Sequence, residues 1–264
     1  MRGLRVIIKG AGEMATGIAC RLYQANIRKI VMLEIPEPLA VRRTVAFCAS
    51  VRNLEATVEG IRAVLIKDLQ ETPGIWAEES IAVLVDPQWR ATTTLKPDVV
   101  IDAIMAKRSL GTRRDEAPLV IGVGPGFVAP ADVHAVVESN RGHNLGRVIY
   151  AGAAESYTGI PGQVGGFTHE RVLRSPHSGI IIHAGKNIGS PVAKGEVVLY
   201  VDDTPVLASI SGILRGLVDE IKVQANEKVG DIEPGADSSY YQTISDKARA
   251  IGGGALEALM HFSR

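Results

Sequence analysis

The sequence predicts an α/β protein in which a Rossmann-like domain with a parallel sheet is followed by a β-rich part. The chain opens with a βαβ unit, because two short apolar runs flank a stretch with helical spacing. Three further apolar runs are continuous, as in strands that are covered on both faces of a parallel sheet. After "GVGPGFVAP", short β-type runs separated by glycine replace the helical patterns. These elements are the runs 4–8 and 30–33 around the helical stretch 14–24, then the runs 81–85, 99–104 and 119–123.

Other segments have weaker patterns. Residues 38–51 could open a helix at their proline, and 63–66 could form a short strand. Residues 133–138 and 148–151 flank a polar connection that contains glycine, which predicts a β-hairpin. The tail after Pro234 has helical spacing that three glycines interrupt, which predicts a pair of helices.

These patterns predict four consecutive regions. They are a Rossmann-like nucleotide-binding domain (1–128), a β-hairpin connecting region (129–171), a compact β domain (172–234) and a C-terminal helical tail (235–264).

The composition is that of a folded globular protein, with 46% hydrophobic and 22% charged residues. Lys plus Arg and Asp plus Glu are balanced at 29 each, so no net field favours nucleic acid or an anionic membrane as a partner. The first apolar run is too short for a signal peptide, and no run approaches the roughly 18 residues of a membrane span. With only two cysteines, the chain is expected to be cytoplasmic.

The segment "KGAGEMATGIA" carries a glycine pattern for binding a diphosphate. Gly10, Gly12 and Ala15 fit G-x-G-x-x-G/A between a predicted strand and a predicted helix. The first glycine permits the turn, the second lets backbone N–H groups approach the phosphates, and the small third residue allows close helix packing. Glu34 ends the next strand, where a carboxylate can bind a ribose diol and disfavours a 2′-phosphate. A turn that only packs tightly remains the alternative, and Glu13 within the loop partly opposes an anion.

Arg42 and Arg43 are further candidates for cofactor binding. Two adjacent guanidinium groups could form a fork for a phosphate or carboxylate, or they could lie on a solvated helix face.

A second cluster follows two strand ends. Asp102 ends one buried run, with Lys107 and Arg108 just beyond it, where open α/β sheets place ligands. We therefore predict catalytic roles for these three residues. The next run ends in a loop whose backbone N–H groups could form a nest for an anion; alternatively, this loop is a plain domain crossover and Asp102 a satisfied buried carboxylate. The glycines of that loop are Gly122, Gly124 and Gly126.

His143 is the remaining catalytic candidate, as a proton donor or phosphate contact in a glycine-framed turn. Its alternative is an exposed turn residue. Asp132 and His134 could form a metal pair, but no third ligand stands at a familiar spacing, so we predict no metal. The chain has neither a G-x-S-x-G elbow nor a Walker loop, which removes the usual support for serine hydrolases and P-loop kinases.

Several long motifs resemble the YqeB-type family of selenium-dependent molybdenum hydroxylase accessory proteins. They include "KGAGEMATGIACRLYQA", "EIPEPLAVRRTVAF", "VIDAIMAKRSLGT", "IGVGPGFVAPADVHAVVESNRGHNLGRVIYAG" and "GDIEP". The resemblance implies a role in molybdenum hydroxylase maturation, near the molybdenum cofactor. Residues 172–234 separately resemble a barrel-sandwich hybrid, the fold of biotinyl and lipoyl domains. Their hairpin Val201 to Pro205 lacks the lysine that would be modified, so no covalent biotin or lipoate is expected.

Three functions remain open at this point. The first is a maturation factor that binds an NAD-like ligand or a pterin dinucleotide non-covalently and works with a molybdenum hydroxylase apoenzyme. The second is an NAD-dependent oxidoreductase, although no acid/base for hydride transfer is evident. The third is a nucleotide-responsive binding module without chemistry. Each has a small-molecule nucleotide ligand as its partner, and each is compatible with a homo-oligomer.

Overall fold

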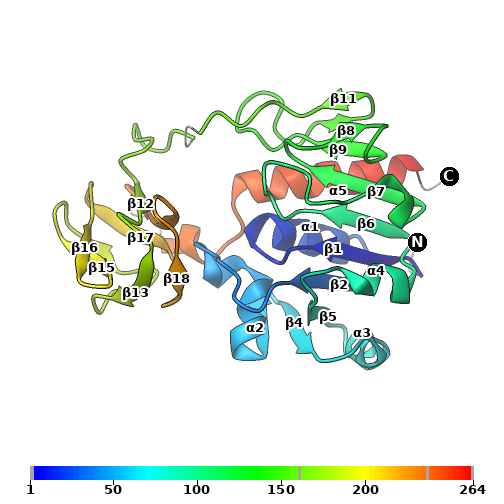
Figure 1. Cartoon of the computed structure of the whole chain (residues 1–264), viewed down its shortest axis with the longest axis horizontal. Coiled ribbons are helices and arrows are strands. Elements are labelled where there is room, and N and C mark those ends of the chain that lie inside the picture. Colours follow the sequence, from blue (N-terminus) through cyan, green and yellow to red (C-terminus); the bar gives the residue numbers. More distant parts are fainter. Residues whose placement is uncertain (1–2, 160–161, 236–237, 263–264) are drawn as a thin grey trace. The chain divides into compact units, whose positions relative to one another are not determined.

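The computed structural model describes residues 3–159, 162–235 and 238–262, and Figure 1 traces their elements. The chain forms two compact units, and each unit combines separated segments. Unit 1 contains Met1–Pro38, Ala46–Tyr157 and Ile244–Arg264, and unit 2 contains Leu39–Val45 and Thr158–Thr243. The two units therefore alternate along the chain, whereas the regions expected from the sequence follow one another.

Unit 1 is organised around a nine-stranded sheet, counted over the described residues, with the order β10-β9-β7-β6-β1-β2-β5-β4-β3. Its central strands are parallel and nearly all buried, because both faces are covered. A separate pair joins β8 (Val128–Ala129) to β11 (Gly152–Ala153). The strands of the large sheet are β1 (Arg5–Lys9), β2 (Lys29–Glu34), β3 (Glu55–Val58), β4 (Ile61–Ile66), β5 (Ile81–Val85), β6 (Val99–Asp102), β7 (Leu119–Val123), β9 (Ala135–Val137) and β10 (Val148–Ile149).

The predicted fold class, a Rossmann-like parallel-sheet domain followed by a β-rich part with a barrel-sandwich hybrid, is wrong. The large sheet is mixed, because β3 runs antiparallel to β4 and β10 antiparallel to β9, and several antiparallel sheets accompany it. Glu59 and Gly60 join β3 to β4 with φ of 48° and 79°. Two positive φ values in a two-residue connection produce a tight hairpin, and the sequence pattern did not reveal it. The chain is mixed α/β.

Helices α1 (Glu13–Gln24) and α5 (Asp246–Phe262) lie side by side in unit 1 (Figure 1). A Cβ added at Gly17 would lie 2.8 Å from the Ala248 Cβ, and one added at Gly252 would lie 2.8 Å from the Gly17 carbonyl oxygen. The absence of side chains at these positions lets the two helix backbones touch. The predicted helix pair is instead one helix, because its glycines serve this packing and do not end the helix.

The remaining helices are short. They are the α-helices α2 (Ser50–Asn53), α3 (Thr72–Ala77) and α4 (Arg90–Leu95), and the 3-10 helices η1 (Arg43–Val45), η2 (Phe47–Ala49), η3 (Leu69–Glu71), η4 (Arg114–Glu116) and η5 (Ser238–Tyr241).

Unit 2 contains two antiparallel four-stranded sheets within its described residues, in the orders β12-β19-β17-β14 and β16-β15-β13-β18. Their buried apolar residues form one core that includes Leu173, Ile181, Val198, Leu214 and Ile232. The strands are β12 (Val172–Arg174), β13 (Gly179–His183), β14 (Pro191–Val192), β15 (Val197–Val201), β16 (Thr204–Leu207), β17 (Gly212–Leu217), β18 (Lys222–Val223) and β19 (Lys228–Glu233).

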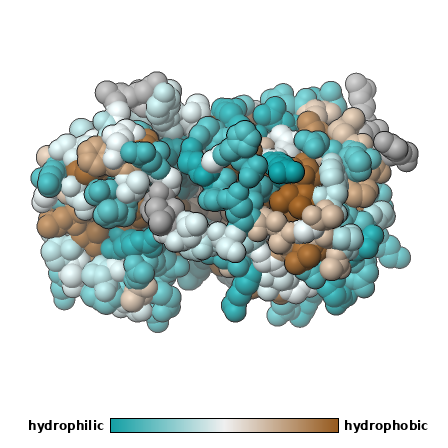
Figure 2. Space-filling view, turned by 90° about the horizontal axis from the view of Figure 1, so that it is seen from above, coloured by the Kyte–Doolittle hydropathy of each residue, from teal (hydrophilic) through white to brown (hydrophobic). Residues whose placement is uncertain are grey.

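The surface drawn in Figure 2 is mixed, with hydrophilic residues around scattered hydrophobic ones. Exposed large hydrophobic residues include Tyr157, Ile180 and Met260. Such residues are normal when they occur singly. None of the helices in the described part of the chain has the length and apolar character needed to cross a membrane.

The contact between α1 and α5 predicts the effect of enlarging Gly17. Gly17→Val would place methyl groups where Ala248 already lies, so we expect a loss of about 1–3 kcal/mol in the free energy of unfolding. Urea-induced unfolding followed by circular dichroism measures it. Gly253→Ala is the matched control on α5, because its added Cβ meets no atom within 4 Å. A Gly17→Val protein as stable as the parent would contradict the packing described.

Candidate ligand site at the carboxyl ends of the strands

The loop between β1 and α1 is held by backbone contacts that require glycine at its first position. Gly10 has φ of 89°, and its N–H donates to the Leu33 carbonyl oxygen at 2.7 Å. A Cβ there would lie 3.3 Å from the Ile104 Cα, in the loop after β6. Two segments that follow neighbouring strands therefore touch at Gly10.

Gly12 is the N-cap residue of α1 and provides no side-chain cap. A Cβ added to it would meet no atom within 4 Å, so the loop is open at this position. The first N–H groups of a helix have no acceptors within the helix, and the helix dipole favours negative charge there. Ala15 is fully buried, which fits its predicted role in close packing.

Glu34, at the end of β2, lies directly beside this loop. Its Oε1 accepts a hydrogen bond from the Ala11 N–H at 2.9 Å, and its Oε2 accepts one from the Ile35 N–H at 2.8 Å. Burial raises the pKa of the Glu34 carboxyl, although both hydrogen bonds oppose that rise. Each oxygen has a further lone pair that can accept a hydroxyl group. The carboxylate is therefore fixed in place and can still bind a diol.

A buried charged cluster connects the ends of β1 and β6. Lys9 is fully buried, and its Nζ donates to Thr112 Oγ1 at 2.7 Å and forms an ion pair with Glu116 Oε2 at 2.6 Å. The Thr112 hydroxyl in turn donates to Asp102 Oδ2 at 2.7 Å. The Lys9 ammonium also lies 3.9 Å from the ring centroid of Trp89. Asp102 is thus part of a network that the sequence interpretation did not anticipate.

Burial governs the titration of this cluster. It lowers the pKa of the Lys9 ammonium, against the opposing effect of Glu116, and raises the pKa of the Asp102 carboxyl, against the hydrogen bond from Thr112. Both shifts favour the neutral form, as expected for charges removed from water. One sequence signal was available, since Lys9 ends an otherwise apolar strand; Thr112 and Glu116 carry no comparable signal.

The loops after β6 and β7 meet, as their positions in the sequence suggest. Gly126 packs on the backbone of Arg108, since a Cβ there would lie 2.6 Å from the Arg108 Cα. A Cβ at Gly124 would similarly meet Ser139 Oγ at 2.5 Å. The Lys107 and Arg108 side chains are exposed, and the Lys107 Nζ lies 3.8 Å from the ring centroid of Tyr157.

Gly122 has a packing role, because the ring of Phe127 lies 2.5 Å from where its Cβ would be. These local contacts account for glycine at Gly122, Gly124 and Gly126 whether or not an anion binds. Their ligand roles remain predictions.

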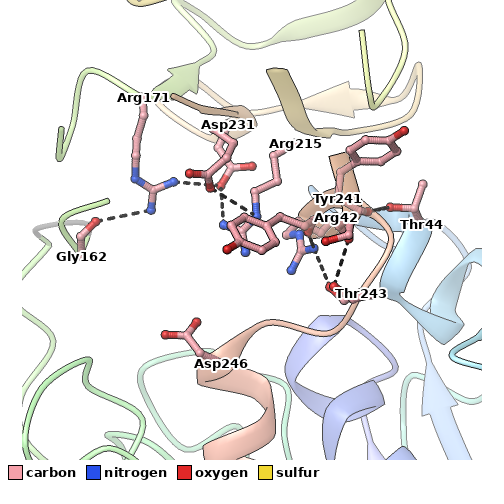
Figure 3. Close-up of polar contacts among 12 residues, drawn as sticks. Arg42, Thr44, Gly162, Arg171, Arg215, Asp231, Tyr241, Thr243 and Asp246 are labelled. Atoms are coloured by element: carbon pink, nitrogen blue, oxygen red, sulfur yellow. Dashed lines mark hydrogen bonds and ion pairs between the residues drawn. The ribbon is translucent and has the colours of Figure 1, made fainter. Parts of the chain in front are cut away.

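Three predicted site residues lie apart from these loops. His143 is in an exposed turn between β9 and β10. Arg42 belongs to unit 2, where its Nη2 donates to the carbonyl oxygens of Tyr240 and Thr243 at 2.6 and 2.9 Å (Figure 3). Arg43, also in unit 2, pairs with Asp219 at 2.8 Å. The contacts of both arginines are therefore with unit 2, and they do not join the glycine loop of unit 1.

No cluster of three or more His, Cys, Asp or Glu side chains suited to a metal occurs within the described residues. The pair Asp132 and His134 is engaged locally. Asp132 accepts a hydrogen bond from the Val128 N–H, and the His134 ring accepts one from the Val120 N–H.

Removal of the buried cation should be costly. Lys9→Met would leave the Glu116 and Asp102 carboxylates without it, so we expect a loss of about 3–5 kcal/mol in the free energy of unfolding. Adding Glu116→Gln to Lys9→Met should restore part of that loss, as measured by urea unfolding. Lys67→Met, at an exposed position, should change stability by less than about 0.5 kcal/mol. Equal effects of the two lysine substitutions would contradict the cluster.

The raised pKa of Asp102 predicts a pH dependence. Between the ordinary value of 3.8 and the raised value, the folded state binds this proton more tightly than the unfolded state. The resulting stability is therefore present at acid pH and is lost as the pH rises through that window. Asp102→Asn lacks this titration, so the stability of the parent relative to the variant should decline between about pH 4 and about pH 7. Urea unfolding at several pH values measures the difference, and a constant or rising difference would refute the assignment.

Comparison with known proteins supports the YqeB resemblance in its coarse form. No family model matches the chain. It is 46% identical over 256 residues to the "Uncharacterized protein YqeB" of Escherichia coli (strain K12), covering 97% of this chain. The match covers 47% of that protein, so the chain spans about half the length of the curated relative it matches. The chain is thus a homologue of YqeB over nearly all its length, and the comparison assigns no activity.

Solved structures offer only distant likenesses. An aspartoacylase family protein from Mesorhizobium loti is 14% identical with a TM-score of 0.28, over 89% of this chain and 87% of that one. A succinylglutamatedesuccinylase/aspartoacylase from Rhodobacter sphaeroides is 13% identical with a TM-score of 0.27, over the same shares. TM-scores this low support no argument about fold or activity.

Proposed function

We propose that unit 1 binds the diphosphate of a nucleotide-bearing ligand at the loop Gly10 to Glu13, in the service of molybdenum hydroxylase maturation. The observation that carries this proposal is the open face at Gly12, on a helix end without a side-chain cap, beside the fixed carboxylate of Glu34. The ligand is NAD-like or a pterin dinucleotide and is held non-covalently.

Each part of such a ligand has a partner in this arrangement. The diphosphate lies against Gly12 and the first N–H groups of α1, where backbone donors and the helix dipole favour negative charge. The ribose hydroxyl groups donate to Glu34, whose negative charge opposes a 2′-phosphate. Lys107 and Arg108 are exposed cations on the loop whose backbone touches Gly10 at Ile104. They contribute charge attraction toward the phosphates.

The maturation role rests on the family that the motifs resemble. In this role the protein retains the nucleotide-bearing ligand and presents it to a molybdenum hydroxylase apoenzyme in the cytoplasm. The buried Asp102 supports the loop that carries Lys107, while direct catalysis by Asp102 would require the loop to open, since only 3% of this residue is exposed. An NAD-dependent oxidoreductase and a module without chemistry are the other outcomes of the test.

Gly12→Asp should abolish nucleotide binding, because its carboxylate would occupy the open position and repel the phosphates. We expect affinity for NAD⁺ to fall at least tenfold, about 1.4 kcal/mol, in isothermal titration calorimetry. NADP⁺ should bind the parent more weakly than NAD⁺, and Glu34→Gln should narrow that difference. Gly74→Asp is the control, because a Cβ at Gly74 also meets no atom within 4 Å.

Mass spectrometry of small molecules released from the purified protein separates the three functions. A retained pterin dinucleotide and increased activity of a demolybdo-apoenzyme support maturation. Change in nicotinamide absorbance with a small substrate would instead identify an oxidoreductase. If the protein retains no adenosine-, nicotinamide- or pterin-bearing compound and binds none in titrations, the proposal fails.

A further inference from the structure

Unit 2 contains a buried cluster of charged side chains on the sheet β12-β19-β17-β14. Asp231 and Glu233 alternate with Ile232 along β19, so they lie on the face opposite the apolar core to which Ile232 contributes. Arg215 lies in β17 where the register shifts between Leu214 and Gly216. A β-bulge of this kind redirects a side chain, and here it brings Arg215 to the face that carries the two acids.

The cations of the cluster converge on one carboxylate oxygen. Asp231 Oδ2 accepts from Lys228 Nζ at 3.0 Å and from Arg171 Nη1 at 3.2 Å, and Arg215 Nη1 lies 3.9 Å away. Figure 3 shows Arg171 and Arg215 directed toward Asp231. Burial alone would raise the pKa of Asp231, yet the three cations together bring it below the usual value. Asp231 therefore remains charged.

The cluster has more positive than negative charge. Arg171, Arg215 and Lys228 face two carboxylates, because Glu233 Oε2 lies 3.9 Å from Arg215 Nε. Three cations against two anions leave one positive charge in excess. The Arg171 side chain is only 8% exposed and that of Arg215 is 12% exposed. Uncompensated charge so far from water is costly.

Hydrogen-bond donors are also in excess at Arg171 and Arg215. The Nε atoms of both residues are buried and have no acceptor among the described residues, and Arg171 Nη2 has only a long contact to the Gly162 carbonyl oxygen at 3.4 Å. Asp231 Oδ1 also has no donor, but it lies against the backbone of Gly216, away from these groups. The two guanidinium groups thus offer donors that the protein itself does not use.

We propose that Arg171, Arg215 and Lys228 bind the phosphate group of a small anionic ligand on unit 2. A phosphate supplies the missing negative charge and several acceptor oxygens, and the planar guanidinium group suits it. Lys228 is 36% exposed, so the anion reaches the cluster from its side. This site is independent of the glycine loop, which belongs to unit 1.

Inorganic phosphate, titrated into the full chain at constant ionic strength in chloride buffer, tests the proposal by calorimetry and thermal unfolding. Phosphate should raise the unfolding temperature saturably, above the effect of acetate or chloride. Lys228→Gln should weaken phosphate binding about tenfold, since a hydrogen bond to a charged group is lost. Asp231→Asn should strengthen it, because it removes the competing carboxylate. Pyrophosphate and a nucleoside monophosphate then distinguish free phosphate from a phosphate ester.

Two controls make the outcome decisive. Arg174→Gln on β12 removes an exposed arginine that donates to the Asn226 carbonyl oxygen, and it should leave phosphate binding unchanged. Gly12→Asp should also leave it unchanged, even if nucleotide binding is lost. Phosphate binding that disappears in Gly12→Asp and persists in Lys228→Gln would overturn the proposal. An equal response to phosphate, acetate and chloride would do the same.

Discussion

The pairing of Lys9 inside unit 1 is the interaction on which the candidate site depends. A fully buried ammonium group requires partners, and the chain provides them only after it has left β6 and returned. Asp102 stands at one end of this excursion, and Thr112 and Glu116 stand at the other. The cluster therefore fixes both ends of the loop that carries Lys107 and Arg108. Exposed cations on that loop owe their position to a buried one.

Glycines then determine how closely the loops approach. Gly10 touches Ile104, and Gly126 touches Arg108, so three loops meet through backbone contacts at the carboxyl ends of the strands. Such contacts allow little adjustment, because a single Cβ would force the backbones apart. Gly12 differs from these glycines because nothing in the protein occupies the space before it. This contrast separates a packing glycine from one that leaves room for a ligand.

The sequence predicted the local elements well and their assembly poorly. The apolar runs at 4–8, 30–33, 81–85 and 119–123 correspond to β1, β2, β5 and β7, because continuous apolar residues directly reflect burial on both faces. The β3–β4 hairpin was missed because its turn places Glu59, a residue with no particular turn preference, at positive φ. Arg42 and Arg43 follow Glu34 closely in the sequence, yet they belong to the other unit. Likewise, no local pattern could show that Lys9 pairs with residues about a hundred positions away.

The alternation of the two units along the chain bears on how the protein folds. Helix α5 packs on α1 through Gly17, but it is synthesised after all of unit 2. During translation, unit 1 must therefore wait with an uncovered helix face while the β-sheets of unit 2 emerge. Contacts so distant in sequence form slowly, because a long loop has to close first. The last helix thus completes the first unit, and the intermediate before that step is where the chain is most exposed to aggregation.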